Sequence, residues 1–180
     1  MPVAPKGEQA AGVKYVRRLM GWFASRLLVL ALILILCVVV FYDAMNTANI
    51  RVILKDGMAK RTQVIMGMED VDAFRLYITD SYRESDGIHG TVAEKASSPY
   101  QLCDVVGIDH RLDMDFVWFW PWDTVKTVRI TERVPKIDGR AKRSGAGVPA
   151  WQDTRYEVTL ELVNKQWKIS RVEALEIADP

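Results

Sequence analysis

The feature that most constrains this chain is an uninterrupted apolar run at residues 27–42 (LLVLALILILCVVVFY), which contains no charged side chain. As a helix the run would rise about 24 Å, and the apolar residues just before it extend it to the roughly 20 residues that cross a hydrocarbon core of about 30 Å. Arg26 lies near one end, where its side chain can reach the headgroups. Trp22 and Tyr42 lie at the two ends, where interface aromatics concentrate. The sequence therefore predicts a transmembrane helix at residues 20–42, in contact with membrane lipid.

A cleavable signal peptide is the alternative interpretation of this run. Signal peptides usually have an apolar region of about 7–15 residues followed by a small-x-small cleavage site. Tyr42 precedes Ala44 by two residues and Asn46 precedes Ala48 by two, so neither alanine completes such a site. Cys37 does not resemble a lipoprotein site, because the apolar run continues beyond it. An uncleaved membrane anchor is favoured.

Charge predicts the orientation of the anchor. Residues 1–26 contain five basic residues and one acidic residue, whereas residues 43–180 contain 19 basic and 22 acidic residues. Cytoplasmic flanks of membrane helices are enriched in Lys and Arg, so we expect a basic cytoplasmic tail at residues 1–19 and the bulk of the chain outside the cytoplasmic membrane. This mildly acidic part does not suit a nucleic-acid binder, which needs a concentrated basic surface.

Cysteine and histidine residues are too scattered to predict a disulfide or a metal site. Cys37 lies in the predicted span and Cys103 far outside it, so the two are not expected to meet. His89 and His110 are isolated, and no paired cysteine spacing occurs. We therefore predict no metal ligand and no cofactor. The 138 residues after the span suffice to bury one core without a disulfide.

The chain after the span is expected to be helical first. Residues 43–68 present a broad apolar face, and no proline separates them from the span, so they predict a membrane-proximal helical segment with candidate breaks at Gly57 and Gly67. A second helix, with acidic residues crowded at its start, is predicted to end at residues 85–87. Residues 87–99 contain two glycines and a proline and are predicted to be a loop.

From residue 100 onward, apolar residues recur at every second position, which is the period of a strand with one buried face. A short turn is predicted at residues 164–166. Helices followed by antiparallel strands predict an α+β domain at residues 69–180, with the helices packed on a curved antiparallel sheet. The predicted strands cover residues 110–120, 125–134, 155–162 and 167–177.

The hairpin at residues 156–173 (YEVTLELVNKQWKISRVE) resembles the C-terminal hairpin of the nuclear-transport-factor-like, or cystatin-like, cone fold. Several bacterial families carry such a domain outside the membrane on a single N-terminal span, among them the inner-membrane assembly component of type IV secretion and conjugation systems. The resemblance implies a cone-like architecture over about residues 43–180. It implies no catalytic or binding residue, because this fold hosts enzymes, binders and scaffolds alike.

An aromatic segment, WFWPW at residues 118–122, contains half of the six tryptophans. One interpretation is a docking surface, with Phe119 and Trp122 exposed, because tryptophan is enriched in binding hot spots and at membrane interfaces. The other places Trp118 and Trp120 in the core, as a continuation of the even-numbered strand face. Both interpretations are open at this point.

Residues 136–150 (KIDGRAKRSGAGVPA) combine basic residues with three glycines and a proline, and they predict a mobile, solvated hairpin loop. A second interpretation is a docking loop for an anionic partner or for lipid headgroups. The basic residues that would form it are Lys136, Arg140, Lys142 and Arg143.

His110 lies among Asp109, Asp113 and Asp115, but the alternation of the strand separates it from them. The three aspartates share a polar face with Arg111, which predicts a solvated surface rather than an acid–base site. If the domain is an enzyme, His110 near Tyr100 or Tyr156 is the residue to suspect. No phosphate loop, no G-x-S-x-G elbow and no H-E-x-x-H helix occurs, and no catalytic residue is predicted.

These observations favour a membrane-tethered, non-enzymatic scaffold or interaction subunit that presents its outer domain to protein partners or to further copies of itself. The alternative is a cone-fold pocket protein that binds or transforms a small apolar molecule. The residues expected to line that pocket are His110, Trp118, Trp120, Tyr156 and Trp167.

Overall fold

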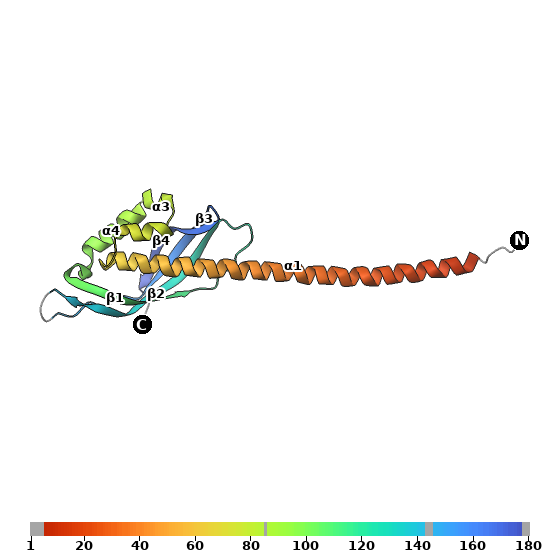
Figure 1. Cartoon of the computed structure of the whole chain (residues 1–180), viewed down its shortest axis with the longest axis horizontal. Helices are drawn as coiled ribbons and strands as arrows, with labels where there is room; N and C mark the ends of the chain where they lie inside the picture. Colours follow the sequence, from red (N-terminus) through yellow and green to blue (C-terminus); the bar gives the residue numbers. More distant parts are fainter. Residues whose placement is uncertain (1–5, 85, 143–145, 178–180) are drawn as a thin grey trace. The chain divides into compact units, whose positions relative to one another are not determined.

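The computed structural model describes residues 6–84, 86–142 and 146–177 (Figure 1). The chain divides into two units, Met1–Ala44 and Met45–Pro180, and one helix, α1 (Lys6–Ile65), contributes residues to both.

Helix α1 contains the predicted span. Within the described residues it is long and apolar enough from Trp22 onward to cross a membrane. Most of its large apolar side chains between Met20 and Phe41 are exposed, unlike those of a core helix. The predicted helical segment after the span is a continuation of the same helix as far as Ile65.

Helix α1 ends in a Schellman motif. The Gly67 N–H donates to the Val64 carbonyl at 3.1 Å, and the Met68 N–H donates to the Gln63 carbonyl at 2.9 Å. Gly67 has a φ of 76°, which a residue without a Cβ adopts readily. The break predicted at Gly67 is therefore confirmed, whereas the break predicted at Gly57 is wrong because the helix continues through it.

The second predicted helix is interrupted. Asp70 caps its start by accepting a hydrogen bond from the Val71 N–H at 2.7 Å. The backbone becomes extended at Ile78, whose side chain is 2% exposed, and the next N–H, of Thr79, donates to the Ile169 carbonyl at 2.9 Å. Burial of Ile78 against the sheet therefore breaks the helix. The resulting elements are α2 (Val71–Phe74), η1 (Arg75–Tyr77) and α3 (Asp80–Glu84).

The segment predicted as a loop at residues 87–99 is mainly helical, and that prediction is wrong. It forms α4 (Asp86–Ser97), which η2 (Pro99–Leu102) follows. Ile88 and Thr91 are buried, and Gly87 lies so close to the Tyr82 ring that a Cβ would approach it to 2.6 Å. Glycine costs about 1 kcal/mol relative to alanine in a helix, and this packing outweighs that cost.

The remaining elements are strands, and in the described residues they form one antiparallel sheet in the order β1-β2-β3-β4. Asn164 and Lys165, with φ of 51° and 65°, join the last two strands within the turn predicted at residues 164–166, and Gln166 already belongs to the last strand. The predicted α+β class is confirmed. The strands are β1 (Cys103–Met114), β2 (Val125–Ala141), β3 (Thr154–Val163) and β4 (Gln166–Ile177).

Strand β2 is longer than the predicted strand at residues 125–134. Lys136 pairs with Asp109 and Arg140 with Asp104 across the antiparallel ladder. The first part of the predicted loop at residues 136–150 is therefore strand, because β1 supplies a hydrogen-bonding partner that composition does not reveal.

The core of the domain lies between one face of the sheet and the C-terminal part of α1, which crosses the sheet in Figure 1. Apolar residues of α1 recur at helical spacing and meet the inward-facing residues of the strands. The fully or almost fully buried members include Ile50, Leu54, Met58, Phe74, Val128, Ile130, Val158, Leu160 and Ile169.

Candidate functional site

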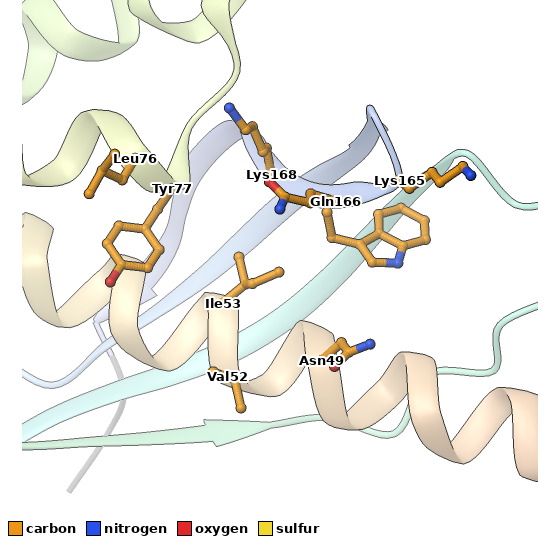
Figure 2. Close-up of a pocket in the computed structure, with 9 residues that line it drawn as sticks. Asn49, Val52, Ile53, Leu76, Tyr77, Lys165, Gln166 and Lys168 are labelled. Carbon is orange, nitrogen blue, oxygen red and sulfur yellow. The ribbon is translucent and has the colours of Figure 1, made fainter.

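A groove of about 420 Å³ opens between α1, η1 and the turn from β3 to β4 (Figure 2). Figure 2 shows Val52 and Ile53 projecting from different sides of α1, with Leu76 and Tyr77 of η1 on the side of Ile53. The side chains of β4 and its turn close the third side. The complete lining is Asn49, Val52, Ile53, Leu76, Tyr77, Lys165, Gln166, Trp167 and Lys168.

The groove has apolar walls that the fold leaves exposed. Leu76 is 77% exposed and Val52 is 58% exposed. Val52 lies between Ile50 and Leu54 in the sequence but on a different side of α1, since residues three and four apart share a helix face. Ile53, three residues after Ile50, packs against the core and also borders the groove. One stripe of α1 therefore enters the core while the adjacent stripe forms the groove wall.

Gly57 allows η1 and β4 to approach α1 beside the groove. A Cβ at this position would lie 2.9 Å from Ile169 Cδ1 and 3.1 Å from Tyr77 Cβ. The glycine that was predicted as a helix break instead permits a close contact between three elements. Tyr77 is held in the groove wall by that contact.

The rim of the groove is basic. Lys165 is exposed at the tip of the β3–β4 turn, Lys168 is partly exposed on β4, and neither forms an ion pair within the described residues. Figure 2 shows their side chains on either side of the turn. An apolar floor with unpaired ammonium groups at its edge suits an apolar side chain flanked by a carboxylate.

Trp167, one of the predicted pocket residues, forms the inner wall of this groove. Its indole Nε1 donates to Asn46 Oδ1 on α1 at 3.3 Å. Its ring meets Phe119 edge-on, with centroids 5.9 Å apart, and the residue is 6% exposed. Trp167 therefore joins α1, β4 and the aromatic segment.

The aromatic segment departs from both interpretations. Phe119, expected at the surface, is 1% exposed, whereas Trp120, expected in the core, is 45% exposed. Trp122 is 71% exposed, as expected, and Trp118 is partly buried. The reason is that β1 ends at Met114. Beyond that residue the strand period no longer determines which side chains point inward.

His110 faces the interior, as the alternation predicts, and it meets a carboxylate that the sequence analysis missed. His110 Nε2 lies 2.8 Å from Glu132 Oε1, with side chains 6% and 0% exposed. The Thr62 hydroxyl donates to the same carboxylate oxygen. The sequence did indicate this carboxylate, because Glu132 is the acidic member of an otherwise apolar strand face that includes Val128, Ile130 and Val134. Both partners are covered by the rest of the domain.

An ion pair with one buried partner lies next to the His110–Glu132 contact: the side chain of Arg61 is 9% exposed and that of Glu94 is 42% exposed. The guanidinium of Arg61 donates to Glu94 and lies over the Tyr156 ring, 5.3 Å from its centroid. Burial by itself lowers the pKa of Arg61, but Tyr156, Glu94 and Glu132 outweigh it and hold the pKa above its ordinary value. Arg61 therefore stays charged. Its place on the inward stripe of α1, between Met58 and Ile65, was the signal in the sequence.

The five predicted pocket residues do not surround one described cavity. Trp167 lines the groove of Figure 2, whereas Tyr156 lines a different cavity of about 390 Å³ that also contacts Tyr100 and Trp151. His110 is enclosed with Glu132, and Trp120 points to the surface. Within the described residues, no group of three or more His, Cys, Asp and Glu side chains could hold a metal ion.

The basic residues proposed for a docking loop are partly engaged with neighbours. Lys136 Nζ lies 2.9 Å from Asp138, and Lys142 Nζ lies 3.6 Å from Asp104. Arg140 is exposed on β2, and Arg143 lies outside the described residues. These contacts reduce the positive charge available to an anionic partner on this part of the surface.

Comparisons with models of protein families, with curated proteins and with solved structures found no match to this chain.

Proposed function

We propose that this protein is a single-pass membrane protein whose outer domain is a non-catalytic interaction module. Its basic tail lies in the cytoplasm, and its α+β domain captures a protein partner in the groove between α1, η1 and the β3–β4 turn. The observation that supports the proposal most directly is the exposed apolar wall of Val52 and Leu76 beside Lys165 and Lys168, neither of which forms an ion pair with a described residue.

The groove has the dimensions of a side-chain anchor site. Pockets that hold small ligands measure about 300–1,000 Å³, and the groove, at about 420 Å³, accommodates one or two large side chains. Binding energy at protein interfaces concentrates in such anchors, which are often aromatic or aliphatic. We therefore infer a partner segment with an apolar anchor followed by Asp or Glu, which would face Lys165 and Lys168.

The membrane anchor contributes to this function by raising the local concentration of the outer domain beside its partner. A domain that is tethered beside its partner binds in an effectively intramolecular reaction, so that a modest groove affinity suffices. The resemblance of the hairpin to membrane-anchored assembly components of secretion and conjugation systems supports a role as an assembly subunit. The enclosure of the His110–Glu132 pair supports a role without catalysis, because a substrate must reach a catalytic group.

Site-specific photocrosslinking in the native membrane tests the proposal. A photoreactive phenylalanine analogue replaces Leu76 in the full chain, and a matched control carries it at Val106, which is 81% exposed on β1. We expect a discrete adduct from position 76 that is absent from position 106 and is lost when Lys165 and Lys168 are both changed to Glu.

Two results would count against the groove as the binding site. Equal adducts from both positions would indicate non-specific encounters, and an adduct that survives charge reversal would remove the acidic partner segment from the proposal. An adduct of twice the chain mass would identify a second copy as the partner.

A further inference from the structure

The connection between β1 and β2, residues 115–124, carries the most exposed aromatic side chains of the outer domain. Phe116 is 83% exposed and Trp122 is 71% exposed. The Trp120 and Trp122 rings stack with centroids 5.1 Å apart and planes 8° from parallel. Trp118 meets Trp120 edge-on at 5.8 Å. These rings contact one another, and their outer faces are exposed.

We propose that this aromatic loop enters the interfacial layer of the same membrane that α1 crosses, and so fixes the outer domain against the membrane surface. The inference rests on the membrane anchorage in the proposed function, but it adds a second contact with lipid. Tryptophan suits that layer because its large ring is apolar and its N–H can bond to water or headgroups.

The loop presents its rings from a fixed turn. The Asp123 carboxylate accepts a hydrogen bond from the Trp120 N–H at 3.0 Å and from Lys126 Nζ at 3.2 Å. The Asp123 N–H in turn donates to the Trp120 carbonyl at 3.0 Å. The hydrogen bond from the Trp120 N–H, assisted by Lys126, holds the pKa of the Asp123 carboxyl below its ordinary value. The Asp123 carboxylate is therefore ionised at neutral pH and continues to accept the hydrogen bond from the Trp120 N–H.

Phe119 fastens the loop to the body of the domain. It is buried against the Trp167 ring, and the Lys126 ammonium lies 5.5 Å from its ring centroid. The chain therefore uses one aromatic residue as an internal anchor and leaves Phe116, Trp120 and Trp122 outside. Little conformational entropy remains to be lost when a turn fixed in this way binds a surface.

The position of the loop in the domain favours lipid over a protein partner. The ring of Phe119 contacts Trp167, whose indole donates to Asn46 at 3.3 Å. Asn46 follows Tyr42, the last residue of the apolar run, by four residues, which is about 6 Å along a helix. The headgroup layer is itself about 5–8 Å thick on each side. The loop therefore lies at the end of the domain from which the chain enters the apolar segment.

The charges at this end of the domain also suit a membrane surface. Lys165 is at the tip of the adjacent β3–β4 turn, and the Leu162 N–H donates to the Thr124 carbonyl at 2.8 Å, so the turn and the loop share one end of the sheet. Exposed lysine attracts anionic headgroups. Asp115 is the exposed acidic residue that opposes this attraction, while Asp123 is paired with Lys126.

Spin-label accessibility in vesicles tests the inference. The full chain, with Cys37 and Cys103 changed to Ser, is reconstituted in phosphatidylcholine–phosphatidylglycerol vesicles. A nitroxide is attached at residue 116 (Phe116→Cys) or, as the exposed control, at residue 106 (Val106→Cys). At residue 116 we expect a ratio of collisions with oxygen to collisions with a water-soluble nickel chelate that is several-fold higher than at residue 106.

The outcomes separate this inference from the anchorage on which it rests. In a separate sample that keeps Cys37 as its single cysteine (Cys103→Ser), a label on Cys37 that is open to the chelate would show that α1 is not inserted, and both proposals would then fail. A shielded Cys37 with a freely chelate-accessible residue 116 would overturn the loop contact alone. A label at residue 116 that neither oxygen nor the chelate reaches would indicate that a protein surface or a second copy covers the loop. That result would also overturn the lipid contact.

A second variant keeps the test independent of the label at residue 116. Trp122→Asp places a charge on the exposed face of the loop, and we expect it to lower the oxygen-to-chelate ratio at residue 116 several-fold. Val106→Asp, at a similarly exposed position, should leave the ratio unchanged. An unchanged ratio in the Trp122→Asp variant, with an unchanged unfolding temperature, would contradict a lipid contact by this loop.

Discussion

Glu132 is a fully buried acidic residue in the core of this domain. Its carboxylate lies on the inward face of β2, fully covered, where it bonds to His110 of β1 and Thr62 of α1. A buried carboxylate is costly unless its partners satisfy it, and its directional bonds then specify how the helix sits on the sheet. We infer that Glu132 determines the register of α1 against the sheet more than the overall stability.

Replacing this carboxylate should therefore lower the free energy of unfolding in proportion to the hydrogen bonds that are lost. Glu132→Ala removes the acceptor of both His110 and Thr62 and should lower the free energy of unfolding by about 2–4 kcal/mol. Glu132→Gln retains one acceptor oxygen and should cost clearly less. Urea unfolding of the full chain in detergent, followed by tryptophan fluorescence, measures both. Equal losses in the two variants would show that the side-chain volume and the acceptor oxygen that glutamine retains do not stabilise the domain at this position.

Two buried tyrosines make the domain sensitive to alkaline pH. Burial raises the pKa of Tyr82 and of Tyr156, and the positive charge of Arg61 offsets only part of that effect. Above the unfolded-state pKa of about 10, the unfolded chain loses protons that the folded chain still holds. The free energy of unfolding is therefore unaffected by these groups below that pH and falls as the pH rises beyond it.

Tyr156→Phe removes one of these titrating groups. The decline in the free energy of unfolding above about pH 10 should become shallower by up to about 1.4 kcal/mol per pH unit. Urea midpoints measured at neutral pH and at successive alkaline values provide the comparison with the unmodified chain. An identical alkaline slope in the two proteins would exclude Tyr156 as a source of the sensitivity.

At the scale of elements, glycine residues occupy two different roles within helices. Gly57 of α1 is enclosed by Ile169 and Tyr77, so a Cβ there would force one of these side chains to shift. Gly90 of α4 has open space, with no atom within 4 Å of a Cβ placed on it. The first glycine permits three elements to meet beside the groove, and the second contributes only conformational freedom to the unfolded chain.

The two glycines should consequently respond to alanine with opposite signs. Gly90→Ala should raise the free energy of unfolding by about 0.5–1 kcal/mol through helix propensity. Gly57→Ala should lower it, because the clash in a packed site, typically about 1–3 kcal/mol, exceeds the same gain. Thermal unfolding of both variants in one detergent gives the comparison. A stabilised Gly57→Ala variant would show that η1 and β4 can move away from α1 without cost.

For the whole molecule, the distribution of charge makes the orientation in the membrane testable. The basic tail and the mildly acidic outer part predict that residue 106 lies outside the cytoplasmic membrane. In a chain with Cys37 and Cys103 changed to Ser, Val106→Cys should react with a membrane-impermeant maleimide in intact cells. A cysteine at residue 10 (Ala10→Cys) should react only after lysis. The reverse pattern would invert the proposed topology and place the groove in the cytoplasm.

The sequence by itself determined the features that depend on neighbouring residues. An apolar run long enough to cross a membrane, the inward direction of His110, the break at Gly67 and a short turn near residues 164–166 all follow from local periodicity or from a local backbone requirement. The antiparallel pairing of β3 with β4 also follows, because a short turn between two alternating segments leaves few other arrangements.

Only the tertiary structure decided the features that depend on residues far apart in the chain. Ile78 leaves its helix because it pairs with Ile169 of β4 in the buried core. Phe119 turns inward because its ring packs against Trp167 at the start of β4. The bond from Thr62 to Glu132 spans 70 residues. The groove likewise combines surfaces from a helix, a short 3₁₀ turn and a hairpin. Periodicity records which face of each element is apolar, but the contact between two faces is determined when the elements pack together.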